Sequence, residues 1–166
     1  MFPTKVYIAL GSNIGHKIFH LRQAIKELRN YGIVSKFGNI YISEPYGFKD
    51  QQQFYNTAIE YITNLQPIEL MEKIKSLETK LKKNKIIENG PRKIDMDIIF
   101  FGKQKFNVSG VSVPHPRAHL RDFVLLPIAD MDKNFIHPTK KKSIKNLLLD
   151  LKENFVFKKL SYRNLR

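Results

Sequence analysis

The chain has 166 residues, a length that suits one hydrophobic core, so we expect a single domain over residues 1–166. It contains no cysteine, which excludes disulfides and thiolate metal sites, and no apolar stretch approaches the roughly 20 residues of a membrane span. The net charge of +14 favours polyanionic partners of several kinds, including nucleotide triphosphates, nucleic acid and anionic membranes. These observations predict a soluble cytoplasmic protein.

The first half of the chain alternates predicted strands with amphipathic helices. Lys5 to Leu10 is typical of a core strand, and apolar residues at helical spacing predict a helix from about Lys17 to Asn30. Ile33 to Ser43 and Phe54 to Thr63 predict a second and a third strand. A second helix begins at Pro67 and reaches about Lys82. The predicted order is therefore strand, helix, strand, strand, helix.

The second half begins with a strand and becomes less informative toward the end. Ile94 to Phe101 predicts the fourth strand of the series. We assign residues 132–166 to packing and not to chemistry. The remaining predictions, in chain order, are an extended segment at Phe106–Val113, a helix that begins near Arg117 and runs to Asp130, a helix at Ile144–Leu151 and a strand at Phe155–Phe157.

The most informative stretch, residues 89–102, is a turn followed by a strand that begins with two carboxylates. Side chains alternate faces along a strand at about 3.3 Å per residue, so Asp95 and Asp97 should project from one face about 7 Å apart. Two ionised carboxylates at that separation repel by roughly 2 kcal/mol at an effective dielectric constant near 20. Spacing alone leaves two explanations open: a solvated strand end with Arg92 and Lys93 as counter-ions, or a Mg²⁺ site with Arg92 as a phosphate donor. The second suits phosphoryl transfer.

The sequence Gly-Pro-Arg-x-Ile-Asp-x-Asp-Ile-Ile at residues 90–99 resembles the signature of the 6-hydroxymethyl-7,8-dihydropterin pyrophosphokinase family of folate biosynthesis. Three further blocks extend the resemblance over roughly residues 5 to 130. They are residues 7–13, residues 45–47 with 54–56, and residues 113–117 with 121–125. The resemblance implies transfer of diphosphate from ATP to the dihydropterin, which releases AMP. It also implies a ferredoxin-like α+β sandwich, an antiparallel sheet with helices packed on one face, and the order of predicted elements fits this fold.

The resemblance also implies a role for individual residues. The catalytic residues would be Lys83, Arg92, Asp95 and Asp97, and the two aspartates would hold two Mg²⁺ ions. ATP would be bound by Lys75, Glu78, Ile98, Ser112, His115 and Arg121. The dihydropterin would be bound by Ser43, Pro45, Tyr46, Gly47, Phe54, Asn56, Asp95 and Phe123. In this set the amide of Asn56 can offer a donor and an acceptor to the pterin edge, and Phe54 and Phe123 would sandwich the ring.

Three positions depart from the family pattern. Asn89 stands where a tryptophan is frequent, Lys82-Lys83 replaces a usual Gly-Arg pair, and Gly110 replaces an arginine found in some members. Asn89 cannot close over the pterin as an aromatic lid. Lys83 offers a point charge in place of a guanidinium fork. We expect these departures to change the closure of the predicted lid at Lys83–Asn89 and the rate of the reaction, more than the class of reaction.

Two other functions fit the basic composition. Ferredoxin-like sheets with aromatic residues also bind RNA, but the RNP1 pattern is absent from this sequence. Paired aspartates would repel a phosphate backbone unless metal ions intervened, which would suit a metal-dependent nuclease. We expect small-molecule substrates, no nucleic acid or membrane partner, and a monomer.

Overall fold

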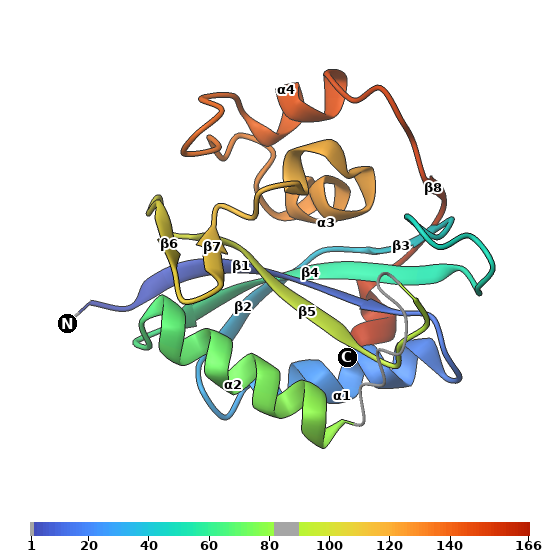
Figure 1. Cartoon of the computed structure of the whole chain (residues 1–166), viewed down its shortest axis with the longest axis horizontal. Coiled ribbons are helices and arrows are strands. Elements are labelled where there is room, and N and C mark those ends of the chain that lie inside the picture. Colours follow the sequence, from blue (N-terminus) through green and yellow to red (C-terminus); the bar gives the residue numbers. More distant parts are fainter. Residues whose placement is uncertain (1, 82–89) are drawn as a thin grey trace.

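A computed structural model describes residues 2–81 and 90–166, and within them the chain forms a mixed sandwich around one large sheet (Figure 1). The strands of this sheet are β1 (Thr4–Ser12), β2 (Ile33–Phe37), β3 (Ile40–Ser43), β4 (Phe54–Thr63), β5 (Asp95–Phe101) and β8 (Val156–Leu160). The helices are α1 (Lys17–Leu28), α2 (Pro67–Lys80), α3 (Asp122–Asp132) and α4 (Ile144–Leu149), with 3-10 turns at Ala118–Leu120 and Tyr162–Leu165.

The strands follow the spatial order β5-β1-β4-β3-β8, and β2 also pairs with β4. Each of these pairings is antiparallel. The chain inserts β4 between β1 and the β2–β3 segment, and adds β5 on the far side of β1. This arrangement is the split β-α-β order of a ferredoxin-like sheet, and it confirms the predicted fold.

The two faces of the sheet carry different helices. Helices α1 and α2 cover one face, as predicted, and their apolar side chains join those of β1 and β4 in the main core (Figure 1). Helices α3 and α4 lie on the opposite face and form a second core there. Central strands buried on both faces explain why Val6, Tyr7 and Ile8 are all buried although they alternate in direction.

The predicted strand Ile33–Ser43 is wrong as one element, because it breaks into β2 and β3 at Gly38 and Asn39. A Cβ on Gly38 would lie 2.5 Å from the backbone oxygen of Pro127 in α3, so the close approach of the helix requires glycine here. The Asn39 N–H donates to an Asp130 carboxylate oxygen at 2.9 Å instead of to a neighbouring strand.

Four later segments also differ from prediction. The extended segment Phe106–Val113 is a hairpin, β6 (Phe106–Val108) and β7 (Val111–Val113), which turns through positive φ at Ser109 and Gly110. The positive φ explains a glycine at position 110. The helix predicted from Arg117 starts as a 3-10 turn and becomes α3 only at Asp122. The predicted C-terminal helix ends at Leu149, and the final strand, β8, begins at Val156 and pairs with β3.

Candidate active site

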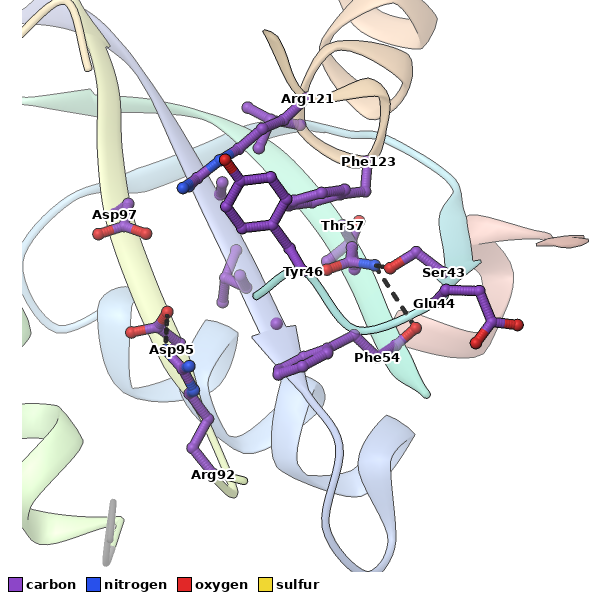
Figure 2. A pocket seen from close by; sticks show the side chains of 15 residues that line it. Ser43, Glu44, Tyr46, Phe54, Thr57, Arg92, Asp95, Asp97, Arg121 and Phe123 are labelled. Carbon is purple, nitrogen blue, oxygen red and sulfur yellow. Dashed lines mark hydrogen bonds and ion pairs between the residues drawn. The ribbon is translucent and has the colours of Figure 1, made fainter. Parts of the chain in front are cut away.

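A pocket of about 90 Å³ opens where the C-terminal end of β1 meets the N-terminal ends of β4 and β5 (Figure 2). The loop that follows β3 and the start of α3 complete its wall. Nine of the sequence-predicted residues line it: Ser43, Tyr46, Phe54, Asn56, Arg92, Asp95, Asp97, Arg121 and Phe123. They come from segments up to 80 residues apart, and the antiparallel order of the sheet brings them together.

The two carboxylates of β5 lie on the same face of the strand, as the spacing predicted. Asp95 and Asp97 are both half-buried and line the pocket, whereas Met96 and Ile98 point to the other side and are buried in the main core. Figure 2 shows both carboxylates along the edge of the pocket. Two carboxylates from one strand face therefore lie at a single place.

Arg92 is buried beside these carboxylates. Its Nη1 donates to Asp95 Oδ2 at 2.8 Å, and its Nε donates to the carbonyl oxygen of Gly90 at 3.0 Å. The guanidinium also lies 5.5 Å from the ring centre of Phe54. Arg92 is only 6% exposed, so its side of the ion pair lies in a setting less polar than water, where charge interactions are stronger.

A buried asparagine joins the turn before β5 to the loop before β4. The Asn13 Oδ1 accepts from the backbone N–H of Arg92 at 2.8 Å, and its Nδ2 donates to Gln51 Oε1 at 2.8 Å and to Gln52 O at 3.0 Å. Asn13 is fully buried, and no role was predicted for it from the sequence. The sequence signal was its position in Gly11-Ser12-Asn13, directly after an apolar run.

The amide of Asn56 is held in one orientation by β3. Its Nδ2 donates to Tyr41 O and to Ser43 Oγ, both at 2.9 Å. Both N–H groups therefore have protein acceptors, and the oxygen is the part of the amide left to meet a ligand. From the sequence we expected the Asn56 amide to offer both a donor and an acceptor to the pterin edge. In the structure it can offer a ligand only its oxygen, as an acceptor.

Aromatic side chains face each other across the pocket. Phe54 lies on one side, and Tyr46 and Phe123 lie together on the other, with ring centres 6.3 Å apart (Figure 2). Tyr46 is flanked by Pro45, which is buried, and by Gly47, whose φ of 85° permits the turn. Neither flanking residue lines the pocket, so their contribution is to the shape of the loop.

Arg121 supplies a second guanidinium beside Tyr46. Tyr46 and Phe123 together form what we call the aromatic wall of the pocket. The central carbon of the Arg121 guanidinium lies 4.7 Å from the ring centre of Tyr46. Burial, with the nearby charge of Arg117, lowers the pKa of Arg121, and the negative charge of Asp97 opposes that shift. Its buried Nε has no hydrogen-bond acceptor among residues 2–81 and 90–166. A half-buried cation with a buried, unsatisfied donor favours an anionic ligand at this point.

His115 lies near the same charges. Burial, together with the positive charges of Arg121 and Arg117, lowers the pKa of His115 to about 4. Its Nδ1 accepts the backbone N–H of Arg117 at 3.2 Å, so the neutral ring carries its proton on Nε2. At neutral pH it is therefore a hydrogen-bond donor without a net charge, and a bound polyphosphate would oppose the lowered pKa.

The other residues predicted to bind ATP lie outside the pocket, around the outer edge of β5. Lys75 is exposed on α2, Ser112 is half-buried on β7, and Ile98 is buried in the main core. Glu78 is buried, and its Oε1 accepts the backbone N–H of Met96 at 2.9 Å. Helix α2 packs against both β5 and β7, so these four side chains come from elements that are neighbours.

Three sequence-based expectations fall on residues 82–89. They are the catalytic role of Lys83, the effect of Asn89 and the lid at Lys83–Asn89, and all of them lie outside the described residues. Separately, none of the described helices is both long enough and apolar enough to cross a bilayer.

The ferredoxin-like sheet and a pocket with two carboxylates, two arginines and facing aromatic rings define a class of protein whose site is suited to small anionic and aromatic ligands. The model of the 7,8-dihydro-6-hydroxymethylpterin-pyrophosphokinase (HPPK) family matches residues 7–133. The chain belongs to this family.

Named relatives agree with this assignment. A 2-amino-4-hydroxy-6-hydroxymethyldihydropteridine pyrophosphokinase of Bacillus subtilis is 42% identical over 127 residues, which are 75% of this chain and 76% of the relative. The corresponding protein of Aquifex aeolicus is 35% identical over 140 residues, 84% of this chain and 88% of the relative. The folic acid synthesis protein fol1 of Pneumocystis carinii is 41% identical over 140 residues, and the match spans 84% of this chain but only 19% of that longer protein.

Solved structures support the fold. The crystal structure of Plasmodium falciparum HPPK-DHPS superposes with a TM-score of 0.71 at 15% identity. The match covers 87% of this chain and 44% of that one, so this chain again corresponds to part of a longer protein.

Proposed function

We propose that the chain transfers the β,γ-diphosphate of ATP to the hydroxymethyl oxygen of 6-hydroxymethyl-7,8-dihydropterin, a step of folate biosynthesis. A bond forms between that oxygen and the β-phosphorus of ATP. The bond between the β-phosphorus and the oxygen that bridges the α- and β-phosphates breaks, and AMP leaves with that oxygen. The hydroxyl proton is lost to solvent. The single observation that carries the proposal is that Asp95, Asp97 and Arg121 share one pocket with a pair of facing aromatic walls.

The dihydropterin would lie between Phe54 and Phe123, whose rings offer flat apolar faces to a heterocycle. The Asn56 oxygen would accept an N–H from the edge of the ring. Because Tyr41 O and Ser43 Oγ hold the Asn56 amide, no rotation of that side chain is needed when the ligand binds. This pre-organisation supports the assignment of the pterin half to β3 and β4.

The phosphates would lie against the charged side of the pocket. Arg92 and Arg121 would donate to phosphate oxygens, and the Nε2–H of His115 would add a neutral donor. Each of these groups is held by a contact within the chain, through Asp95, Tyr46 and the Arg117 N–H respectively. Positioned donors of this kind stabilise charge that develops during transfer.

The donor set fits Mg²⁺. Among the described residues no three His, Cys, Asp or Glu side chains cluster as a metal site, and Asp95 and Asp97 offer two carboxylates. Mg²⁺ takes one or two protein carboxylates and completes its octahedron with water and substrate phosphates. We propose two ions, and when bound they would neutralise charge on the polyphosphate.

The remaining parts of the proposal rest on the sequence. We propose that the adenosine of ATP lies toward α2, β5 and β7, near Lys75, Glu78, Ile98 and Ser112, and that Lys83 approaches the phosphates. We also propose one pyrophosphokinase domain over residues 1–166 that acts as a monomer in the cytoplasm, with no nucleic-acid partner. The inward direction of Arg92 and Arg121 supports a small-molecule ligand over an extended polyanion.

The mass of the pterin product tests this proposal. After incubation with Mg·ATP, we expect 6-hydroxymethyl-7,8-dihydropterin to gain two phosphoryl groups in one step. A product with one added phosphoryl group would make the chain an ordinary kinase and would contradict the proposal. An unmodified pterin together with salt-sensitive RNA binding would favour the nucleic-acid alternative.

A further inference from the structure

Phe155 lies beyond the region that the family model matches, residues 7–133, and it contacts the aromatic wall of the pocket from behind. Its ring centre is 5.4 Å from that of Tyr46 at an interplanar angle of 69°, and 6.0 Å from that of Phe123 at 81°. Both contacts are edge-to-face, a favoured arrangement of aromatic pairs. Phe155 itself does not line the pocket, so any effect on the ligand must pass through the two rings that do.

The backbone of Phe155 is fixed from two sides. Asp122 Oδ2, at the start of α3, accepts the N–H groups of Phe155 and Val156 at 2.8 and 2.9 Å. The carbonyl oxygen of Phe155 accepts the N–H of Glu44 at 3.0 Å. Asp122 is 3% exposed, and hydrogen bonds to a buried carboxylate are strong. The segment before β8 is therefore fastened both to α3 and to the loop that carries Tyr46.

Tyr46 connects the two halves of the pocket. One neighbour of its ring is Phe123 on the pterin side, and another is the guanidinium of Arg121 on the phosphate side. Figure 2 shows Tyr46 between these two residues. A shift of Tyr46 would consequently change the shape of the aromatic wall and the support of Arg121 together.

Tyr46 lies between the pocket and a second hollow. That hollow, of about 400 Å³, lies between α4 and the loop after β3, and both Tyr46 and Phe155 line it. Tyr46 borders both spaces. Removal of the Phe155 ring would leave Tyr46 without its packing partner on the side of the second hollow, where there is room for it to move.

We infer that Phe155 is a positioning residue for the dihydropterin: it fixes Tyr46 and Phe123 from behind, so that the C-terminal segment sets the width of the pterin half of the pocket. This inference rests on the proposed function for its substrate. It gives a role in the site to a segment that the sequence analysis assigned to packing alone.

The test compares Phe155→Ala with Phe157→Ala, a matched control two residues away whose ring is 53% exposed. Loss of two aromatic contacts should raise the KM for the dihydropterin by about tenfold in Phe155→Ala. Its KM for ATP should rise by less, about twofold to threefold, because only the indirect support of Arg121 through Tyr46 is disturbed. Phe155→Leu, which refills most of the space, should show about a twofold rise. Phe157→Ala should match the unmodified chain.

Hydrogen exchange provides a readout that needs no catalysis. Amides of residues 44–53 should exchange faster in Phe155→Ala, while those of β1 and β4 keep their protection. If the unmodified chain made no pterin diphosphate, the proposed function would fail, and the exchange data would still decide whether Phe155 fixes the loop. An unchanged pterin KM together with unchanged exchange at residues 44–53 would overturn the inference. Should Phe155→Ala not fold, Phe155→Leu measured against Phe157→Leu decides in the same way.

Discussion

The pocket has two halves, which we propose to bind the dihydropterin and the phosphates, and the chain holds them in different ways. In the pterin half, on β3 and β4, the amide N–H groups of Asn56 are satisfied by Tyr41 and Ser43. In the phosphate half, on β5 and at the start of α3, Arg92 pairs with Asp95, while the buried Nε of Arg121 has no acceptor among the described residues. In the first half the protein already satisfies its own hydrogen-bond donors, so the shape of the pocket selects the ligand. In the second half charged side chains are concentrated, and a donor of Arg121 needs an acceptor from the ligand.

This contrast predicts the largest effect in the phosphate half. Asp97→Ala should reduce turnover by on the order of a thousandfold or more, because it removes one of the two carboxylates that would hold the metal. The fold should persist, since Asp97 is only half-buried at the edge of the pocket. Steady-state AMP release and a thermal melt measure the two effects separately. Asp150→Ala, at an exposed ion pair with Lys142, is the control and should retain full activity; substantial turnover by Asp97→Ala would reject the metal role.

The pterin half should respond mainly through binding. Asn56→Ala removes the acceptor for the pterin and leaves Tyr41 O and Ser43 Oγ without their donor. We expect kcat/KM for the pterin to fall by about a hundredfold, as for a lost buried hydrogen-bonding group, with a smaller change in the KM for ATP. Calorimetric titration of the pterin would measure the same loss as affinity. An equal fall for both substrates would mean that the two halves are not distinct.

Asn13 tests how far the halves depend on each other, because it bonds the turn at Arg92 to the loop at Gln51 and Gln52. Asn13→Ala should lower the free energy of unfolding by about 1–3 kcal/mol, the range for unsatisfied buried partners. It should also lower kcat/KM for both substrates by roughly tenfold, since about 1.4 kcal/mol of lost positioning is a factor of ten. Denaturant titration and kinetics with each substrate varied would show this. A loss confined to one substrate would mean that Asn13 serves only that half.

The smallest expected effect is the pH dependence that His115 gives to stability. The folded-state pKa of His115 is about 4, below its ordinary value of 6.5, so the unfolded chain binds more protons between these values. Stability from this group is present above pH 6.5 and is lost as the pH falls toward 4. His115→Asn should therefore make the melting temperature less dependent on pH in that window. Asn56→Ala should leave that dependence unchanged because an amide does not titrate; an unchanged slope in His115→Asn would contradict the assignment.

The sequence predicted the parts of this structure that depend on local pattern. Alternation along Phe54–Thr63 gave β4 with its bounds, and the spacing of Asp95 and Asp97 placed both carboxylates on one face. The resemblance to the family supplied the partners of that site, including Asn56 and Arg121. Neither local pattern nor motif shows which atoms of those side chains already form hydrogen bonds within the protein.

Features that depend on contacts between distant segments were missed. The break at Gly38 exists because Pro127 lies against it, nearly 90 residues later in the chain. Helical spacing places Glu78 beside the apolar face of its helix, but nothing in that helix indicates that its carboxylate accepts a backbone hydrogen bond from Met96. Asn13 and Phe155 likewise act on segments far from their own.

Pterin-dependent release of AMP from Mg·ATP is the most direct test of the proposed reaction, because it requires both halves of the pocket at once. We expect AMP, and not ADP, in amounts that match the dihydropterin consumed, with little AMP formed when the pterin is omitted. ADP as the nucleotide product, or AMP formed equally without the pterin, would contradict it.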